Sequence, residues 1–136
     1  IIKAADGKIS VSVDHNTRVN IKEREAAIAR GGVYADGYMW DTKTDRGLQV
    51  GRVLGDWPIC FVSNKPDVYS ISLDYASFVL IVTDGVSDPS HYDDGYVKYL
   101  TSKVEKGADA QDIIDDALAR KIGDNATAVL WRPVAF

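Results

Sequence analysis

Two aspartates stand beside apolar runs, where their side chains could do chemistry together. Asp84 directly follows the run at residues 78–83, and Asp124 comes shortly before the run at residues 127–131. If these runs are strands that pair antiparallel, the end of the first lies beside the beginning of the second. Both carboxylates would then lie at one edge of a sheet, where each disfavours ionisation of the other unless a positive charge compensates them. A divalent cation does so, and oxygen ligands without a Cys/His cluster favour Mg²⁺ or Mn²⁺ over zinc.

A simpler explanation fits the same residues. Asp-Gly is a common turn after a strand, and Asp-Asn is a common entry into one. The spacing of the two aspartates therefore leaves open both a metal site and plain turn chemistry.

The elements that must position these aspartates follow from the hydrophobic pattern. The order of strands, helix, strands, helix pair and strand predicts an α+β fold with a largely antiparallel sheet. The strand that precedes Asp84 is apolar on both faces, which predicts a central position in the sheet. We expect a hairpin at 1–13, helices at 20–30, 93–106 and 109–121, an irregular excursion or loose hairpin at 34–47, and strands at 48–53, 68–71, 78–83 and 127–131.

The first expected helix has a recognisable beginning. Asn20 is a suitable N-cap, and Glu23 follows three residues later, as in a capping box. Ile21, Ala27 and Ile28 share one helical face, which we expect to be buried.

Composition excludes several classes of protein. The 136 residues are 46% hydrophobic and 26% charged, as in one globular domain. A net charge of −4 with scattered basic residues argues against nucleic-acid binding. The longest apolar run is too short to cross a membrane. The single cysteine, Cys60, cannot form an internal disulfide, so we expect an intracellular protein, cytoplasmic or nuclear.

Six short motifs in series resemble the type 2C family of metal-dependent serine/threonine protein phosphatases. Their order and approximate spacing both agree with the family, and together they span essentially the whole chain. They are Val13-Asp14-His15-Asn16, Glu23-Arg24-Glu25 with Gly31-Gly32, residues 48–56, Pro66-Asp67-Val68, residues 82–88, and Gly123-Asp124-Asn125-Ala126-Thr127.

The resemblance implies a role for particular residues. Asp84 and Asp124 match two late aspartates that hold one ion of the family's binuclear Mg²⁺ or Mn²⁺ centre, with Gly85 and Asn125 beside them in the same motifs. Asp88 matches the second aspartate of the first motif, near a third and weaker ion. Arg52 and Asp56 match a segment beside the site, where we expect them to support the strand turn. Residues 21–47 match the flap-like subdomain that flanks the substrate cleft.

The resemblance also implies a reaction and a limit. The family hydrolyses phosphoserine and phosphothreonine in proteins with a water activated by two metal ions. The matched part is the second half of the domain, one half of an α-β-β-α sandwich with a C-terminal helix pair on one face. An early arginine, a Glu-Asp pair and the Asp-Gly-His-Gly segment with the bridging carboxylate have no counterpart here. We therefore expect the chain alone to be inactive, to expose apolar surface, and to need its N-terminal half or another partner.

Two other functions stay open at this point. The first is a non-catalytic phosphatase-like scaffold or regulatory subunit of a larger assembly. Gly51, which stands where the family usually has serine, leaves room for it. The second is an unrelated α+β binding module in which the motif order is coincidental.

Several other residues have simple explanations. We expect Cys60 to be a small buried hydrophobic residue, and His15 and His91 to be loop residues rather than catalytic bases. Residues 41–47 suggest a solvated turn rather than a calcium loop. An aromatic cluster in the flap region fits either local packing or a partner-binding patch, and it consists of Tyr34, Tyr38, Met39 and Trp40.

Overall fold

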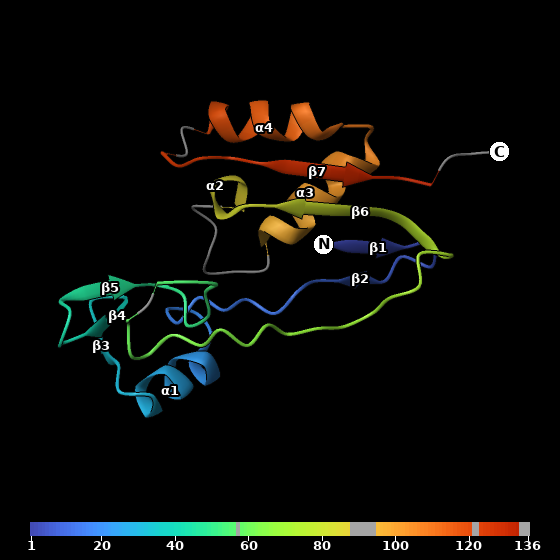
Figure 1. Ribbon diagram of the computed structural model, residues 1–136. Helices are drawn as coiled ribbons and strands as arrows, with labels where there is room; N and C mark the ends of the chain where they lie inside the picture. Colours follow the sequence, from blue (N-terminus) through green and yellow to red (C-terminus); the bar gives the residue numbers. More distant parts are fainter. Residues whose placement is uncertain (57, 88–94, 121–122, 134–136) are drawn as a thin grey trace. The chain divides into compact units, whose positions relative to one another are not determined.

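The computed structural model of the protein describes residues 1–56, 58–87, 95–120 and 123–133. The chain folds into two compact units, with Ile1–Ser12 and Ser70–Phe136 in the first and Val13–Tyr69 in the second (Figure 1). The first unit combines several helices with an antiparallel sheet and the second combines one helix with another antiparallel sheet, which confirms the α+β prediction. The region 21–47 lies entirely within the second unit.

The first unit is built on a four-stranded sheet in the order β2-β1-β6-β7, in which every neighbouring pair is antiparallel. The expected hairpin is present, and Gly7 in its turn has a φ of 90°. The strand before Asp84 lies inside the sheet, as predicted for a central strand. The bounds of the four strands are Ile2–Ala4 for β1, Ile9–Ser10 for β2, Ala76–Val82 for β6 and Ala128–Trp131 for β7.

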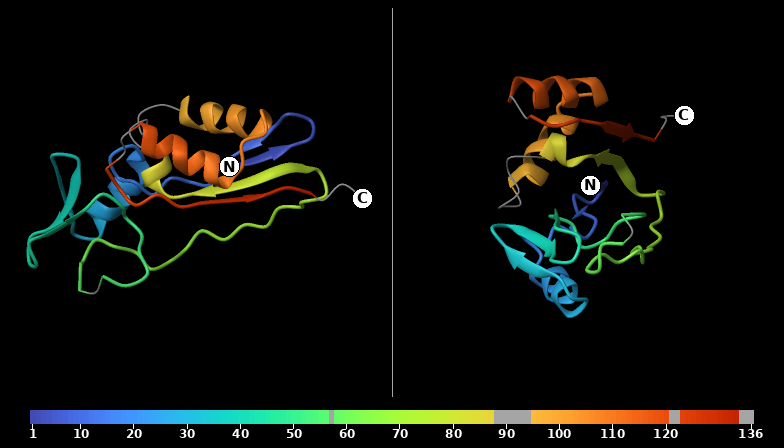
Figure 2. Two further views of the ribbon diagram at one scale, coloured as in Figure 1. Left: turned by 90° about the horizontal axis from the view of Figure 1, so that it is seen from above. Right: turned by 60° about the vertical axis from the view of Figure 1, so that its left-hand side comes forward.

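Helices cover one face of this sheet (Figure 2). Phe78 and Leu80 of β6 pack on this face against the two long helices. Asp109 forms a reciprocal capping box with Asp112, which fixes where α4 begins. The helices of the first unit are α2 (Asp84–Ser87), α3 (Gly95–Glu105) and α4 (Ala110–Ala119), so the expected helix pair is confirmed.

The opposite face of the sheet carries exposed apolar side chains, in line with the apolar surface expected of this half of the domain. Ile81 of β6 is 63% exposed, and Val129 and Trp131 of β7 are exposed too. The register pairs Ile81 with Val129, which places both side chains on the same face. The sequence pattern indicated apolar side chains on both faces of β6, and it contained no information on which face the helices cover.

The second unit contains one helix and a small three-stranded antiparallel sheet in the order β3-β4-β5. This sheet lies where the sequence suggested an irregular excursion or a loose hairpin at 34–47, and its antiparallel β3–β4 pair fits the hairpin. Met39, Ile59 and Phe61 form the apolar core together with Ala27. The elements are α1 (Ile21–Ala29), β3 (Val33–Ala35), β4 (Tyr38–Asp41) and β5 (Arg46–Leu48).

Helix α1 begins as predicted but buries a different face. The Asn20 side chain accepts a hydrogen bond from the backbone N–H of Glu23, so the predicted N-cap is confirmed. Ile21 is 61% exposed and Ile28 is also exposed, whereas Glu23 and Ala27 are buried. The apolar pattern missed this orientation because a charged side chain occupies the buried face.

Two predicted strands do not form. The segment expected as a strand at 48–53 bonds to two different partners, since Gly51 N–H donates to His15 and Gly51 C=O accepts from Ser63. It therefore leaves only isolated bridges at Val50 and Arg52 in place of a regular ladder. The segment at 68–71 has no strand partner among the described residues, and Val68 is 86% exposed.

Candidate functional site

The pairing of β6 with β7 brings the two aspartate segments together. Val82 lies opposite Ala128 in the antiparallel register, and the next pair is joined by a hydrogen bond from Thr83 N–H to Thr127 C=O of 3.1 Å. The Thr83 hydroxyl continues the contact by accepting from Thr127 N–H at 3.0 Å. The end of β6 thus lies beside the beginning of β7, as the sequence predicted.

A glycine allows an even closer approach one residue later. A Cβ atom on Gly85 would lie 2.1 Å from the carbonyl oxygen of Asn125, a separation that no side chain tolerates. Only glycine therefore lets the backbone beside Asp84 contact the backbone beside Asp124. This contact accounts for the glycine that follows Asp84.

The two carboxylates at this rim are exposed. One oxygen of Asp84 accepts the N–H of Gly85 at 3.0 Å, and one oxygen of Asp124 accepts the N–H of Asn125 at 2.7 Å. Within the described part of the chain, neither carboxylate forms an ion pair with a basic side chain. Exposed carboxylate oxygens without a protein cation beside them are donors that suit Mg²⁺ or Mn²⁺.

The described residues supply only part of a metal centre. Among them, no group of three or more His, Cys, Asp or Glu side chains lies together. Asp88 and His91 lie outside the described residues. The structure therefore brings together the segments of two predicted ligands, Asp84 and Asp124, and leaves their role as ligands a prediction.

Arg52 and Asp56 belong to the second unit. The Arg52 guanidinium donates through Nε to Glu23 at 3.0 Å and through Nη1 to Asp67 at 2.6 Å. Asp56 is exposed in a turn with a φ of 53°, and its carbonyl accepts the N–H of Ile59. Arg52 thus links three segments of this unit, and the supporting role beside the site that the sequence suggested for Arg52 and Asp56 stays a prediction.

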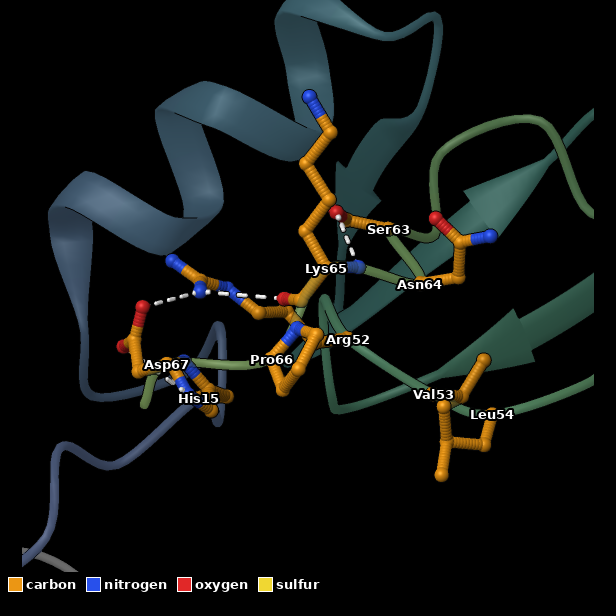
Figure 3. A pocket seen from close by; sticks show the side chains of 9 residues that line it. All are labelled: His15, Arg52, Val53, Leu54, Ser63, Asn64, Lys65, Pro66 and Asp67. Atoms are coloured by element: carbon orange, nitrogen blue, oxygen red, sulfur yellow. Dashed lines mark hydrogen bonds and ion pairs between the residues drawn. The ribbon is translucent and has the colours of Figure 1, made fainter. Parts of the chain in front are cut away.

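His15 completes this cluster beside a pocket of about 300 Å³ (Figure 3). Its Nδ1 lies 3.3 Å from a Glu23 oxygen and its Nε2 lies 3.4 Å from an Asp67 oxygen. Figure 3 shows Arg52 reaching toward Asp67 with His15 next to them. The histidine expected to be a loop residue therefore links two carboxylates of its unit.

Glu23 is the centre of this charge cluster and is only 5% exposed. Burial opposes its ionisation, but hydrogen bonds and charge from Arg52, with a contribution from His15, outweigh burial and lower the pKa of Glu23. The same hydrogen bond to Glu23, with that to Asp67, raises the pKa of Arg52. The sequence pattern suggested only a capping role for Glu23, and nothing in its spacing indicated a buried ion-pair cluster.

The cluster also accounts for the glycine at position 51. A Cβ atom there would lie 2.8 Å from a carboxylate oxygen of Glu23 and 2.9 Å from its Cγ. Arg30 approaches from the other side, donating to Gly51 C=O at 3.1 Å. Glycine at this position gives the buried carboxylate room to meet its basic partners.

Asp41 is a second buried acid that the sequence did not reveal. It is 1% exposed, and its two oxygens accept the N–H groups of Lys43 and Cys60. These backbone hydrogen bonds, that from Lys43 first, lower the pKa of Asp41. The turn that begins here was expected to be solvated, and at Asp41 that expectation was wrong.

Cys60 shows no sign of an activated thiol. Burial, followed by the nearby charge of Asp41, raises its pKa. It packs at the edge of the Met39 and Phe61 core, as expected for a small hydrophobic residue. A raised pKa disfavours the thiolate that a cysteine nucleophile requires.

The aromatic cluster of the small sheet divides between two faces. Met39 is buried and Tyr34 packs against the core, while Tyr38 is exposed on the opposite face near Trp40, with 6.2 Å between ring centroids. The Trp40 ring lies against Gly47, where a Cβ atom would approach it to 3.0 Å. Local packing therefore accounts for Tyr34 and Met39. Of this cluster, Tyr38 and Trp40 are left as candidates for a partner-binding patch.

Comparison with known proteins identifies the family. The family model described as protein phosphatase 2C matches residues 1–127, so the chain belongs to the protein phosphatase 2C family. It is similar to a rice protein, from Oryza sativa subsp. japonica, named "Probable protein phosphatase 2C 57". The two are 29% identical over an alignment of 136 positions that covers 90% of this chain and 35% of the rice protein. The chain thus spans about a third of that relative's length.

No solved structure gives a significant match to the chain. Among the described residues, none of the helices has the length and apolar character needed to cross a membrane.

Proposed function

We propose that the complete domain to which this chain contributes hydrolyses phosphoserine and phosphothreonine esters of proteins, with Mg²⁺ or Mn²⁺ as cofactor. Membership of the protein phosphatase 2C family supports this reaction class. Water adds to the phosphorus as the bond to the serine or threonine oxygen breaks, which releases phosphate and the free hydroxyl. Divalent ions supply this chemistry with an activated water and with positive charge for the phosphoryl oxygens. We expect the complete domain to act inside the cell.

Within this chain we assign the metal-holding role to Asp84 and Asp124, with Asp88 as a further candidate. The observation that carries this proposal is the joining of their segments at the β6–β7 rim, through Thr83 and Thr127 and through the close contact of Gly85 with Asn125. Both assigned carboxylates of the described chain are exposed and lack a basic partner there. The chain alone is proposed to be inactive, because no segment of it matches the one that supplies the bridging carboxylate.

The test uses the full-length protein and a phosphoserine peptide. We expect phosphate release only with Mn²⁺ or Mg²⁺, and a loss of more than about 100-fold in Asp84→Ala and in Asp124→Ala. Asp115→Ala is the matched control, because Asp115 is exposed on α4 and accepts a hydrogen bond from Gln111. That control is expected to keep full activity.

Two outcomes would change the proposal. Normal turnover by both Asp84→Ala and Asp124→Ala would reject the assigned metal ligands. Tight Mn²⁺ binding by the full-length protein without release of phosphate from any phosphopeptide would favour the non-catalytic scaffold.

A further inference from the structure

An arginine at the end of α4 reaches across to the short helix that carries Asp84. Nη2 of Arg120 donates a hydrogen bond of 2.7 Å to the backbone carbonyl of Val86 in α2. Arg120 stands four residues before Asp124 in the sequence, and Val86 stands two residues after Asp84. One side chain thus joins the two segments that bear the assigned aspartates.

Arg120 is held in place by its own helix. Its Nε donates to Asp116 Oδ2 at 3.0 Å, a pair separated by one helical turn. The guanidinium is planar and rigid, so fixing Nε also fixes the direction in which Nη2 points. The bond to Val86 is therefore directional.

Asp116 is in turn fixed from α3. Its Oδ1 accepts from Lys103 Nζ and from the Tyr99 hydroxyl, both at 2.6 Å. Burial opposes its ionisation, but the hydrogen bonds from Lys103 and Tyr99 outweigh burial and lower the pKa of Asp116. The anion that orients Arg120 is thus itself anchored by two side chains of a second helix.

The far end of this chain of contacts is equally fixed. The Val86 side chain is fully buried in the core of the first unit, and Val86 N–H donates to Thr83 C=O at 3.0 Å. Gly85 contacts the backbone of Asn125 on the opposite side of the same turn. The turn that presents Asp84 is therefore held by the backbone of Asn125 and by the side chain of Arg120.

We propose that Arg120, oriented by Asp116, is a positioning residue for the metal site, which sets the separation of Asp84 and Asp124. This inference rests on the proposed metal-binding role of those aspartates. Arg120 acts through the backbone of α2, so its loss lets the two aspartate segments move apart without removing any ligand. Metal ions tolerate little change in ligand separation, and partners that orient ligands affect affinity by about 10-fold to 100-fold.

The experiment measures Mn²⁺ affinity by titration calorimetry and thermal unfolding without metal, both on the full-length protein. The variants are Arg120→Met and Arg120→Lys, because lysine keeps the charge but cannot hold Asp116 and Val86 at once. Arg132→Met is the matched control. Arg132 donates through Nη2 to the carbonyls of Val104 and Ala108, a similar arginine bond to backbone at the end of α3.

We expect both Arg120 variants to weaken Mn²⁺ binding about tenfold. Without metal, Arg132→Met and Arg120→Met are expected to lower the unfolding temperature by similar amounts. Arg132→Met is expected to keep the wild-type Mn²⁺ affinity. If Arg120 had a purely structural role, its variants would lower the unfolding temperature but would bind Mn²⁺ as tightly as Arg132→Met does. If Arg120→Met does not fold, the Mn²⁺ affinity of Arg120→Lys is compared with that of Arg132→Met instead.

Asp84→Asn separates the two proposals. If it abolishes Mn²⁺ binding while the Arg120 variants bind Mn²⁺ as tightly as Arg132→Met, the positioning role is wrong and the metal site stands. If Asp84→Asn leaves Mn²⁺ affinity unchanged, the proposed metal site is wrong, and the positioning role is overturned with it.

Discussion

The two units of the protein differ in how deeply they bury acidic side chains. In the first unit the core is apolar, with Phe78, Leu80 and Leu100 buried, and the carboxylates of Asp84 and Asp124 are exposed at the sheet rim. In the second unit two carboxylates, Glu23 and Asp41, are themselves buried. The first unit is thus stabilised by apolar burial and the second also depends on charge pairing.

This difference separates acids that are available to a ligand from acids that hold the fold. Glu23 has Arg52 and His15 as partners, and Asp41 has two backbone N–H groups. Each would have to give up these contacts to bind a metal ion. Asp84 and Asp124 each give one oxygen to a neighbouring N–H and make no ion pair within the described chain, as the metal-holding role proposed for them requires.

The largest expected effect is at the rim of the first unit. Gly85→Ala places a Cβ atom 2.1 Å from the Asn125 carbonyl, and a backbone neighbour cannot rotate away. We expect a loss of about 3 kcal/mol in the free energy of unfolding, measured by hydrogen exchange at β6 and β7 amides. Gly123→Ala is the control, because nothing lies within 4 Å of the Cβ it would add. Equal stability of the two variants would contradict the close contact.

Removing the buried charge of the second unit is expected to come next. Glu23→Gln keeps the shape of the side chain but leaves Arg52 and His15 without their shared anion, which should cost about 2 kcal/mol in urea unfolding. Glu25→Gln, on the same helix but exposed, should change stability little. A neutral result for Glu23→Gln would mean that the cluster does not stabilise this unit.

A smaller loss is expected at Gly51. The Cβ of Gly51→Ala would lie 2.8 Å from a Glu23 oxygen, but this neighbour is a side chain that can shift. We expect a loss of about 1 kcal/mol, less than for Gly85→Ala. In a double-mutant cycle, Glu23→Ala should remove most of the effect by removing the clash. Additive losses would show that the crowding at Gly51 has another source.

Acid should distinguish the units through the order in which they lose structure. Lowered pKa values fall on Glu23 and Asp41 in the second unit and, among the described carboxylates of the first, on Asp116. A carboxyl group whose pKa is lowered by folding stabilises the fold when the pH is above its ordinary pKa of about 4. This stabilisation is lost as the pH falls from that value through the lower pKa of the folded state.

We therefore expect amides of the second unit to lose exchange protection at a higher pH than those of β6. Glu23→Gln should reduce the pH dependence in the second unit and leave that of β6 unchanged. Earlier loss of protection in β6 would contradict the assignment of charge dependence to the second unit.

The parts of the fold that could be predicted depend on contacts close in sequence. The hairpin turn at Asp6 and Gly7, the Asn20 cap and the two long helices all follow from local patterns. The antiparallel meeting of the strands before Asp84 and after Asp124 was a hypothesis from their apolar runs, and the structure contains this pair. The candidate metal ligands Asp84 and Asp124 stand near the ends of these two strands.

The failures involve partners distant in sequence. The residues at 68–71 have strand-like composition but no strand beside them in the described structure, and composition alone does not supply a partner. Glu23 fits an exposed helix position until Arg52 and His15, from other parts of the chain, surround it. The Arg120 contact to Val86 has no signal in the spacing of either residue.

The sequence by itself determined the family, the order of the motifs and which two aspartates stand at strand ends, because side-chain type and local period carry this information directly. Only the tertiary structure decided which acids are paired and which are open to a cation. Pairing depends on distances between segments far apart in the chain, and a carboxylate buried beside an arginine has the same letter as one exposed at a rim.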